Sequence, residues 1–307
     1  MKLSLVIVNF HSFEYIQRCL ASVDASWCSQ VVLVDNSRDP LEADRLTSLV
    51  LPVTHKVIIE PDNLGFGAAA NDGIRLALRD EPDHPVWLVN PDMTFPAETP
   101  IALIDRLSLG VDDILSPVIV SGEHHALQIW FAGGAVDQRT GDVVHDDYLS
   151  PYDRTEPPLT RSTSFMCGAA PVFTRDAWIQ LGGFRDDLFL YWEDAELSLR
   201  AQDARLRMTV LGPADPVWHA VGGTGQGSGQ SEAFYYYSAR NRVMIMRQRN
   251  GWSALARPHL LIQLIKFVLR PVRRERSQRV PKSLAALRGY FDGVRSVLPR
   301  EPSSRRH

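Results

Sequence analysis

The stretch from Val86 to Met93 constrains the fold more than any other part of the sequence. Val86-Trp-Leu-Val89 is an apolar run that leads directly into Asn90-Pro-Asp92. Such a run is typical of a strand buried on both faces of a parallel sheet, and ligands bind at the carboxyl edge of such a sheet. An aspartate at that edge can hold a divalent cation, which in turn can hold a diphosphate. The tripeptide Asn-Pro-Asp is also typical of an ordinary Asx turn after a strand, so two interpretations stay open: a ligand site or a turn without a ligand.

Similar apolar runs alternate with helical patterns along the first 120 residues. The runs that predict strands are Leu3 to Val8, Val31 to Val34, Lys56 to Glu60 and Ile114 to Val120. Four segments predict helices. The first follows Ser12, which can cap it; the others include Leu46 to Val50, Gly65 to about Arg79, and Ile101 to Leu107. Short strands separated by helices predict an α/β fold with a largely parallel sheet and right-handed crossovers.

The pattern is looser after residue 120. Ile129-Trp-Phe-Ala-Gly-Gly134 and Val143-Val144 indicate an antiparallel excursion, residues 150–161 are a proline-rich loop, and Arg207 to Leu211 predict a further strand. We therefore expect a nucleotide-binding first half and an acceptor-binding second half.

A glycine-rich segment follows the third strand. Gly65-Phe-Gly67-Ala-Ala-Ala70 matches the G-x-G-x-x-A pattern of dinucleotide-binding proteins. That pattern belongs to the first strand-helix turn of a Rossmann unit, so the match is weak here. Two interpretations stay open: amides at this helix N-terminus could bind phosphate, or the glycines could only allow close packing of helix and strand.

Two acids and a histidine are candidate functional residues in the second half. Glu193 and Asp194 follow the aromatic run Phe189-Leu-Tyr-Trp192 at the start of a predicted helix, where capping and general-base catalysis are equally good explanations. Partial burial and mutual repulsion would push their pKa values apart. His219 precedes the glycine-rich stretch 222–229, which suggests a metal ligand beneath a lid, although a surface histidine before a linker fits as well.

The charge is distributed unevenly. Residues 240–307 hold 17 Lys/Arg against 3 Asp/Glu, whereas the whole chain has a net charge of -3. A helix is predicted over 232–249, ended by Gly251, and the apolar segment His259 to Leu269 is followed at once by the basic residues 270–276. This arrangement favours an anionic membrane surface over nucleic acid as partner, although a helix docked on the protein's own core is nearly as good an explanation.

Other composition signals point to a cytoplasmic protein. The three cysteines form no metal-binding spacing and leave an odd thiol in any pairing, which fits a reducing compartment. We expect no signal peptide, because the first apolar run is too short, and no spanning helix.

Taken together, seven ordered motifs resemble glycosyltransferase family 2, and in particular its bacterial rhamnosyltransferase-like branch. The resemblance covers residues 3 to about 249. The motifs are Val6-Ile-Val-Asn9, Val34-Asp-Asn-Ser37, Asn63-Leu-Gly-Phe-Gly-Ala-Ala-Ala-Asn71, Leu88-Val-Asn-Pro-Asp92, Gly182-Gly-Phe184, Tyr191-Trp-Glu-Asp194 and His219.

The resemblance implies the GT-A fold, a Rossmann-like, mixed but mainly parallel sheet flanked by helices, here followed by a C-terminal helical extension. It implies a nucleotide-diphospho-sugar donor, a divalent cation (Mg²⁺ or Mn²⁺) and inversion at the anomeric carbon. The domain expected is residues 1–249, with a nucleotide lobe at about 1–120 and an acceptor lobe at about 121–231, and residues 250–307 form a basic helical tail with a disordered end.

The resemblance also assigns roles to single residues. Asp194, beside Glu193, matches the catalytic base. Asp92 matches the last acid of the metal-binding DxD motif, with Asn90 in place of the first acid, and His219 matches a downstream metal ligand. The donor-binding positions implied are Asn9, Asp35, Asn63, Gly65, Asn71, Asn90 and Asp92.

The resemblance places the enzyme in cell-wall or surface polysaccharide synthesis, with L-rhamnose from dTDP-rhamnose as the first expectation and a glycan or lipid-linked acceptor. Two other classes remain open. An NAD(P)-type oxidoreductase would use the glycine motif, and a non-catalytic nucleotide-sugar-binding scaffold would use the basic tail to bind a membrane or nucleic acid.

Overall fold

The computed structural model describes the chain except residues 124–125, 154–158, 213–215, 221–228, 256–257 and 297–307. It divides into two compact units. The first holds Met1–Val136, Asp142–Phe189 and Glu193–Gln226, and the second holds Asp137–Gly141, Leu190–Trp192 and Gly227–His307. The expected glycine lid over 222–229 and the chain end beyond Pro299 lie almost wholly outside the described residues.

An eight-stranded sheet forms the centre of the first unit, with the strand order β11-β13-β6-β12-β4-β1-β2-β3. Strands β4, β1, β2 and β3 are mutually parallel, β13 is parallel to β6, and only β12 and β11 run antiparallel to their neighbours. The bounds are β1 Leu3–Asn9, β2 Cys28–Asp35, β3 Thr54–Ile59, β4 Val86–Leu88, β6 Ile114–Pro117, β11 Leu159–Ser162, β12 Val172–Phe173 and β13 Met208–Gly212. The predicted mixed, mainly parallel sheet is confirmed.

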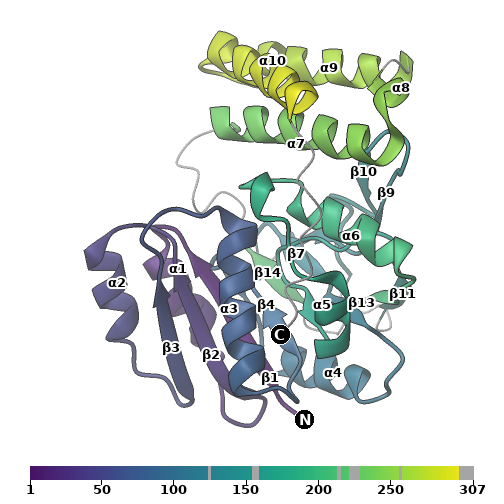
Figure 1. The fold of residues 1–307 in the computed structure, drawn as a ribbon. Coiled ribbons are helices and arrows are strands. Elements are labelled where there is room, and N and C mark those ends of the chain that lie inside the picture. Colours follow the sequence, from purple (N-terminus) through teal and green to yellow (C-terminus); the bar gives the residue numbers. More distant parts are fainter. Residues whose placement is uncertain (124–125, 154–158, 213–215, 221–228, 256–257, 297–307) are drawn as a thin grey trace, which may run out of the picture. The chain divides into compact units, whose positions relative to one another are not determined.

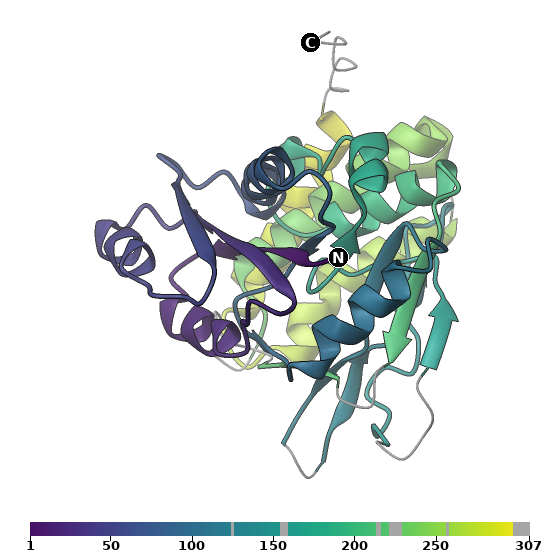
Figure 2. The same cartoon turned by 90° about the horizontal axis from the view of Figure 1, so that it is seen from below.

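Helices cover both faces of the parallel strands (Figures 1 and 2). Helices α1 (Phe13–Leu20) and α2 (Pro40–Thr47) lie on one face, and α3 (Phe66–Asp80) lies on the other. This arrangement follows from right-handed crossovers, because the chain moves from β1 through β2 to β3 in one direction and then returns past β1 to β4. All seven residues of β1 are buried between these layers.

A smaller sheet with the order β5-β14-β7-β8 lies in the same unit. Its strands are β5 Met93–Thr94, β7 Ile119–Ser121, β8 Gln128–Phe131 and β14 Val217–His219, and a separate hairpin pairs β9 Gly134–Val136 with β10 Val143–His145. The single strand predicted over Ile114 to Val120 is wrong. It divides between the two sheets after Pro117, which lacks the amide hydrogen needed to continue the ladder.

Two local expectations also differ from the structure. Ser12 stands at the N-cap of α1, but its hydroxyl donates to the carbonyl of Phe10 at 2.9 Å instead of capping the helix. Val50 lies beyond the end of α2 and is 94% exposed, so it does not belong to that helix's apolar face.

The remaining helices of the first unit are α4 Glu98–Leu107, α5 Arg175–Leu181, the short 3₁₀ helix η1 Asp186–Leu188 and α6 Glu193–Asp203. Helix α5 is capped at its N-terminus by Thr174, whose hydroxyl accepts a hydrogen bond from the amide of Ala177, and at its C-terminus by Gly182 in the left-handed conformation. The chain then reaches α6 through a segment in which Phe189 has a positive φ of 65°.

The second unit is helical. It contains α7 Glu232–Asn250, α8 Trp252–Leu255, α9 Pro258–Arg274 and α10 Arg279–Arg295 (Figure 1). Helices α7 and α10 approach closely, since a Cβ at Gly289 or Gly293 would meet the carbonyl oxygen of Tyr236 or Arg240 within 2.4 Å. The helix predicted over 232–249 and its end at Gly251 are confirmed, and α7 packs with the C-terminal helices.

Candidate active site

The carboxyl ends of β1 and β2 carry a buried polar cluster. Asn9 and Asp35 are opposite each other in the parallel register. The amide of Asn9 donates to Asp35 Oδ1 at 2.9 Å and to Glu42 Oε2 at 3.0 Å, and its oxygen accepts from the Ser12 amide at 3.0 Å. Asn9 therefore orients Asp35 and uses both of its own donors on protein groups.

Asp35 has one carboxylate oxygen left for a ligand. Its Oδ1 accepts from Asn9 and from the amide of Ser37, whereas Oδ2 is buried and has no hydrogen-bond partner among the described residues. Buried polar groups are normally paired, so an unpaired carboxylate oxygen at a strand edge indicates a place for an external donor. A ring N–H of a nucleobase is such a donor.

Asn63 and Gly65 lie in the loop between β3 and α3, and Asn36 holds that loop. The Asn36 side chain donates to Asn63 Oδ1 at 2.9 Å and accepts from the Leu64 amide at 2.8 Å. Asn63 Oδ1 also accepts from the amide of Gly65. No sequence pattern indicated this role of Asn36, because the contact joins two loops far apart in the chain.

The space above Gly65 is occupied by protein. Gly65 has a φ of +84°, and a Cβ there would lie 2.1 Å from the carbonyl oxygen of Phe189. The amide of Phe66 donates to that same oxygen at 2.9 Å. Gly73, further along α3, would clash with Val6 and Val34 of the sheet if it carried a Cβ. These contacts favour the packing explanation for the glycine motif over a dinucleotide fingerprint.

Asn71 of α3 is fully engaged with residues 184–186, at the start of η1. Its amide donates to the Phe184 carbonyl and to Asp186 Oδ1, both at 2.8 Å, and its oxygen accepts from the Phe184 amide at 2.8 Å. The structure therefore gives Asn71 a positioning role for residues 184–186, while direct contact of Asn71 with a donor stays a prediction.

Asp92 and His219 meet, although 127 positions separate them in the sequence. Antiparallel pairing of β5 with β14 places Met93 opposite His219, and His219 Nε2 lies 3.1 Å from Asp92 Oδ2. Both side chains are almost buried, with 12% and 10% of their areas exposed. The Trp130 ring packs edge-on against the His219 ring, with centroids 4.4 Å apart. The structure thus brings these two predicted site residues together, and their role as metal ligands stays a prediction.

This pair fits a divalent cation as a partial set of ligands. A carboxylate oxygen suits Mg²⁺ and Mn²⁺, and a neutral imidazole nitrogen is the commonest metal ligand among side chains. Among the described residues, no group of three or more His, Cys, Asp or Glu side chains could hold a metal. Asp92 and His219 would thus hold a cation together with oxygens of a bound diphosphate, as metal ions in nucleotide sites commonly do.

Asp194 lies in the first turn of α6, and amide hydrogens fix its carboxylate. Oδ1 accepts from its neighbour Ala195 at 2.7 Å, and Oδ2 accepts from Gly168 at 3.2 Å. Burial raises the pKa of Asp194, whereas these amides and the charge of His145 act in the opposite direction. The net direction is upward, so the helix N-terminus does not fully offset burial.

Glu193 is more deeply enclosed. It is 9% exposed, and its Oε2 is buried with no hydrogen-bond partner among the described residues. Burial and the adjacent Asp194 charge raise the pKa of Glu193 to about 8. Two neighbouring carboxyls with raised pKa values are the arrangement expected of a site that handles a proton near neutral pH.

The backbone segment Gly168–Ala169 connects Asp194 to the turn that carries Asp92. The Asn90 amide donates to the carbonyl of Ala169 at 2.8 Å, and the next residue back, Gly168, donates its amide to Asp194. One backbone segment thus lies between the two acids.

His145 and Trp130 are two further residues near His219 and Asp194 that the sequence did not reveal. His145 Nδ1 lies 3.1 Å from the Trp130 carbonyl, and its ring packs at 5.5 Å between centroids against Phe165. Trp130 also contacts His219, and His145 acts electrostatically on Asp194. The sequence predicted an antiparallel excursion at β8 and β10, but no local pattern gives the sheet pairings that bring these two rings together.

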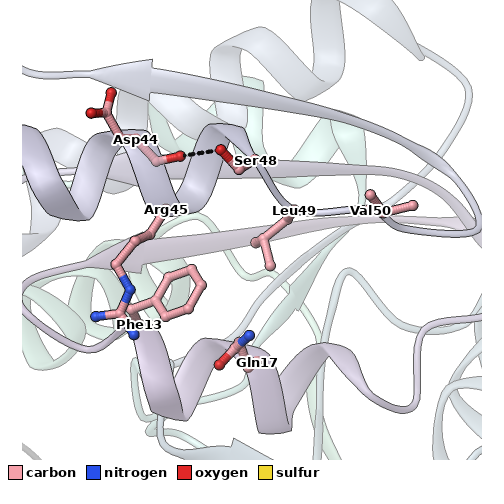
Figure 3. A pocket seen from close by; sticks show the side chains of 7 residues that line it. All are labelled: Phe13, Gln17, Asp44, Arg45, Ser48, Leu49 and Val50. Atoms are coloured by element: carbon pink, nitrogen blue, oxygen red, sulfur yellow. Dashed lines mark hydrogen bonds between the residues drawn. The ribbon is translucent and has the colours of Figure 1, made fainter.

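A separate cavity of about 560 Å³ lies between α1 and α2 (Figure 3). Arg45 covers the ring of Phe13 at 3.9 Å and pairs with Glu14 and Glu42, so its charge is already compensated. None of the predicted site residues lines this cavity, and nothing in its lining indicates catalysis.

Comparison with known proteins supports the fold. No protein-family model and no curated protein matches the sequence. A crystal structure of GalNAc-T7 with UDP, GalNAc and Mn²⁺ superposes with a TM-score of 0.61 at 16% identity, covering 80% of this chain and 48% of that one. The chain thus spans about half the length of that neighbour. A crystal structure of S. aureus TarS 1-349 has a TM-score of 0.50 at 16% identity, covering 94% of this chain and 89% of that one. The chain therefore has the GT-A fold of glycosyltransferases, as its resemblance to family 2 implies.

Proposed function

We propose that the protein is an inverting glycosyltransferase of the hexosyltransferase type that uses a nucleotide-diphospho-sugar donor. The observation that carries this proposal is the backbone segment Gly168–Ala169. It hydrogen-bonds both to Asp194, at the start of α6, and to Asn90, in the turn that bears Asp92. The GT-A fold and the UDP bound to GalNAc-T7 support a donor of this class.

The nucleotide would bind across the carboxyl ends of β1 and β2. Asp35 Oδ2 would accept a hydrogen bond from the base, with Asn9 holding the carboxylate in place. Asn63 and Gly65 would flank the ribose and diphosphate, and Asn71 would support that side through residues 184–186. Asn90 and Asp92 would lie at the diphosphate.

Asp194 would act as the base. Its carboxylate would take the proton of the acceptor hydroxyl while that oxygen attacks the anomeric carbon opposite the leaving diphosphate. A base is most effective when its pKa is close to the working pH, so the raised pKa of Asp194 suits this task. Glu193, with a pKa of about 8, would remain largely protonated at neutral pH and so limit repulsion beside Asp194. A cation held by Asp92 and His219 would supply Lewis-acid stabilisation of the leaving diphosphate.

The finer assignment rests on the family resemblance. We expect L-rhamnose from dTDP-rhamnose as the sugar, a glycan or lipid-linked acceptor, and a role in cell-wall or surface polysaccharide synthesis. We also expect a cytoplasmic enzyme that associates peripherally with the membrane through its basic tail. None of the helices in the described part of the chain has the length and apolar character to cross a bilayer.

A donor screen tests the proposal. Purified protein is incubated with dTDP-rhamnose, UDP-N-acetylglucosamine, UDP-galactofuranose and UDP-glucose in the presence of Mn²⁺, and nucleotide release is measured with the wild type and with Asp194→Asn. Release from at least one donor by the wild type only is the expected result. Binding of NAD(P)H but of no nucleotide sugar would favour the oxidoreductase alternative. Metal-dependent binding of a nucleotide sugar, with no release of nucleotide whichever acceptor is added, would favour the non-catalytic scaffold.

A further inference from the structure

A basic cavity lies within the second unit. It has a volume of about 430 Å³ and is formed by one residue of α7 and six residues of α9. The lining residues are Arg242, Gln263, Lys266, Phe267, Arg270, Arg273 and Arg274. Five of these seven side chains are cationic, and none is acidic.

Four of the five cationic side chains at this cavity have no ion pair within the described part of the chain. Lys266, Arg270, Arg273 and Arg274 make no ion pair there. The neighbouring acid, Glu275, is turned inward, where Lys282 Nζ and the Tyr235 hydroxyl donate to it at 2.7 and 2.9 Å. Several like charges around one hollow repel one another, so an anion in the cavity would stabilise the arrangement.

An exposed apolar stripe runs along α9 beside the cavity. Leu261, Ile265 and Leu269 follow at four-residue spacing, Val272 continues the stripe, and Ile265 is 59% exposed. The same helix buries Leu260 and Leu264 in the core of this unit. Helix α9 therefore presents three stripes: one in the core, one apolar and exposed, and one basic at the cavity.

Helix α10 has an exposed apolar stripe of its own. Val280, Leu284, Leu287 and Phe291 recur at helical spacing and are all exposed. Gly289 and Gly293, which contact α7, lie on the opposite side of this helix. A soluble surface rarely exposes so many large apolar side chains on two adjacent helices without a partner.

We propose that the cavity between α7 and α9 binds the phosphate group of an anionic membrane lipid, with the apolar stripe of α9 resting in the headgroup and acyl boundary. Guanidinium groups pair with phosphate in forked geometry, and three arginines of α9 face this cavity. Residues 258–295 hold nine Lys/Arg against two Asp/Glu, which complements an anionic leaflet. A dissolved anion or a nucleic acid would use the basic residues but would leave the apolar stripe exposed to water.

This site gives the proposed membrane association a defined ligand, and it does not depend on sugar transfer. An Asp194→Asn protein should bind vesicles as the wild type does, so failure of the catalytic proposal would leave this one intact. Equally, loss of vesicle binding would leave donor turnover with a water-soluble acceptor unaffected.

The test measures co-sedimentation of the full-length protein with vesicles. One set contains phosphatidylcholine alone, and the other contains phosphatidylcholine mixed equally with phosphatidylglycerol. The wild type should bind only the anionic set. Replacing Arg270, Arg273 and Arg274 together by glutamine should weaken this binding by about 100-fold. The matched control replaces Arg276, Arg288 and Arg295, which carry the same charge but do not line the cavity, and should weaken it by less than about tenfold.

A second variant distinguishes binding of a lipid from binding of a phosphate group alone. Ile265→Ser should weaken vesicle binding but leave calorimetric binding of inorganic pyrophosphate unchanged. Circular dichroism and thermal unfolding establish that each variant is folded. Equal losses in the two arginine variants would overturn the site in favour of diffuse attraction. Tight pyrophosphate binding without vesicle binding would overturn the lipid as ligand, and so would displacement from vesicles by a short single-stranded oligonucleotide that binds more tightly.

Discussion

Two buried glutamates, one in each unit, show how differently the chain treats an enclosed acid. Glu275 is 4% exposed and accepts hydrogen bonds from Lys282, Tyr235 and the Gln230 amide. Glu193 is 9% exposed, yet its Oε2 has no partner within the described residues. Burial alone would raise the pKa of both. The donors around Glu275 outweigh burial and lower its pKa, whereas the pKa of Glu193 rises to about 8.

The comparison shows that partners, more than burial, determine the charge of these carboxyls. Glu275 serves the fold, since each of its oxygens is used. The pair Glu193 and Asp194 is kept at a cost in stability, which is typical of residues retained for their chemistry. Each of the following substitutions tests one side of this contrast.

Asp194→Asn should have the largest effect. The amide keeps the shape of the side chain but cannot take a proton, so kcat should fall by about 1,000-fold while donor binding is retained. Nucleotide release and fluorescence titration with the nucleotide measure the two quantities. Asp203→Asn, at the exposed opposite end of α6, is the control and should retain full turnover. Wild-type turnover in Asp194→Asn would remove Asp194 from the role of base.

Glu275→Gln should destabilise the second unit by about 3 kcal/mol, because it leaves the buried Lys282 ammonium without its counter-charge. Urea unfolding monitored by circular dichroism measures the change. The double variant Glu275→Leu, Lys282→Met removes both charges and should recover most of the lost stability. If the single variant were as stable as the wild type, the hydrogen bonds and ion pair of Glu275 would not stabilise the second unit.

Glu193→Gln should change the pH dependence of stability. Between its ordinary pKa of 4.5 and the folded value of about 8, the folded protein keeps a proton on Glu193 that the unfolded chain releases. Wild-type stability therefore falls as pH rises through this window. Glutamine cannot ionise, so the variant should lose less stability between pH 5 and pH 8. Its Tm should fall by about 5 °C less over this range than the Tm of the wild type. Parallel melting curves for the two proteins at all pH values would contradict the raised pKa.

His145→Phe should have the smallest effect. The charge of His145 lowers the pKa of Asp194, so its removal should let that pKa rise further. The rising limb of kcat/KM against pH, which reports deprotonation of the base, should then move to higher pH with little change in the plateau. An unchanged limb would mean that His145 does not act on the base.

Local patterns predicted much of the fold. The apolar runs of β1, β2 and β4 and the spacing of α3 are decided by burial between neighbouring layers, and burial leaves a direct mark in the sequence. The division at Pro117 could also have been found, because proline interrupts a strand ladder.

The site was predictable only in part. Asp92 and His219 were paired through the family resemblance, and β5 and β14 bring them together. The roles of Asn36 and Trp130 had no signal, because each depends on a contact between segments that are distant in the chain. Single-sequence periodicity records which face of an element is buried, but not which loop meets it.

The contact between Gly65 and Phe189 has a consequence for inherited variation. The carbonyl of residue 189 fills the space of a side chain at residue 65, and the backbone that carries it runs on toward Asp194, the proposed catalytic base. A substitution at this glycine would push the two loops apart. It would appear as an inactive protein with every acid and imidazole in place, a defect that a survey of catalytic residues alone would miss.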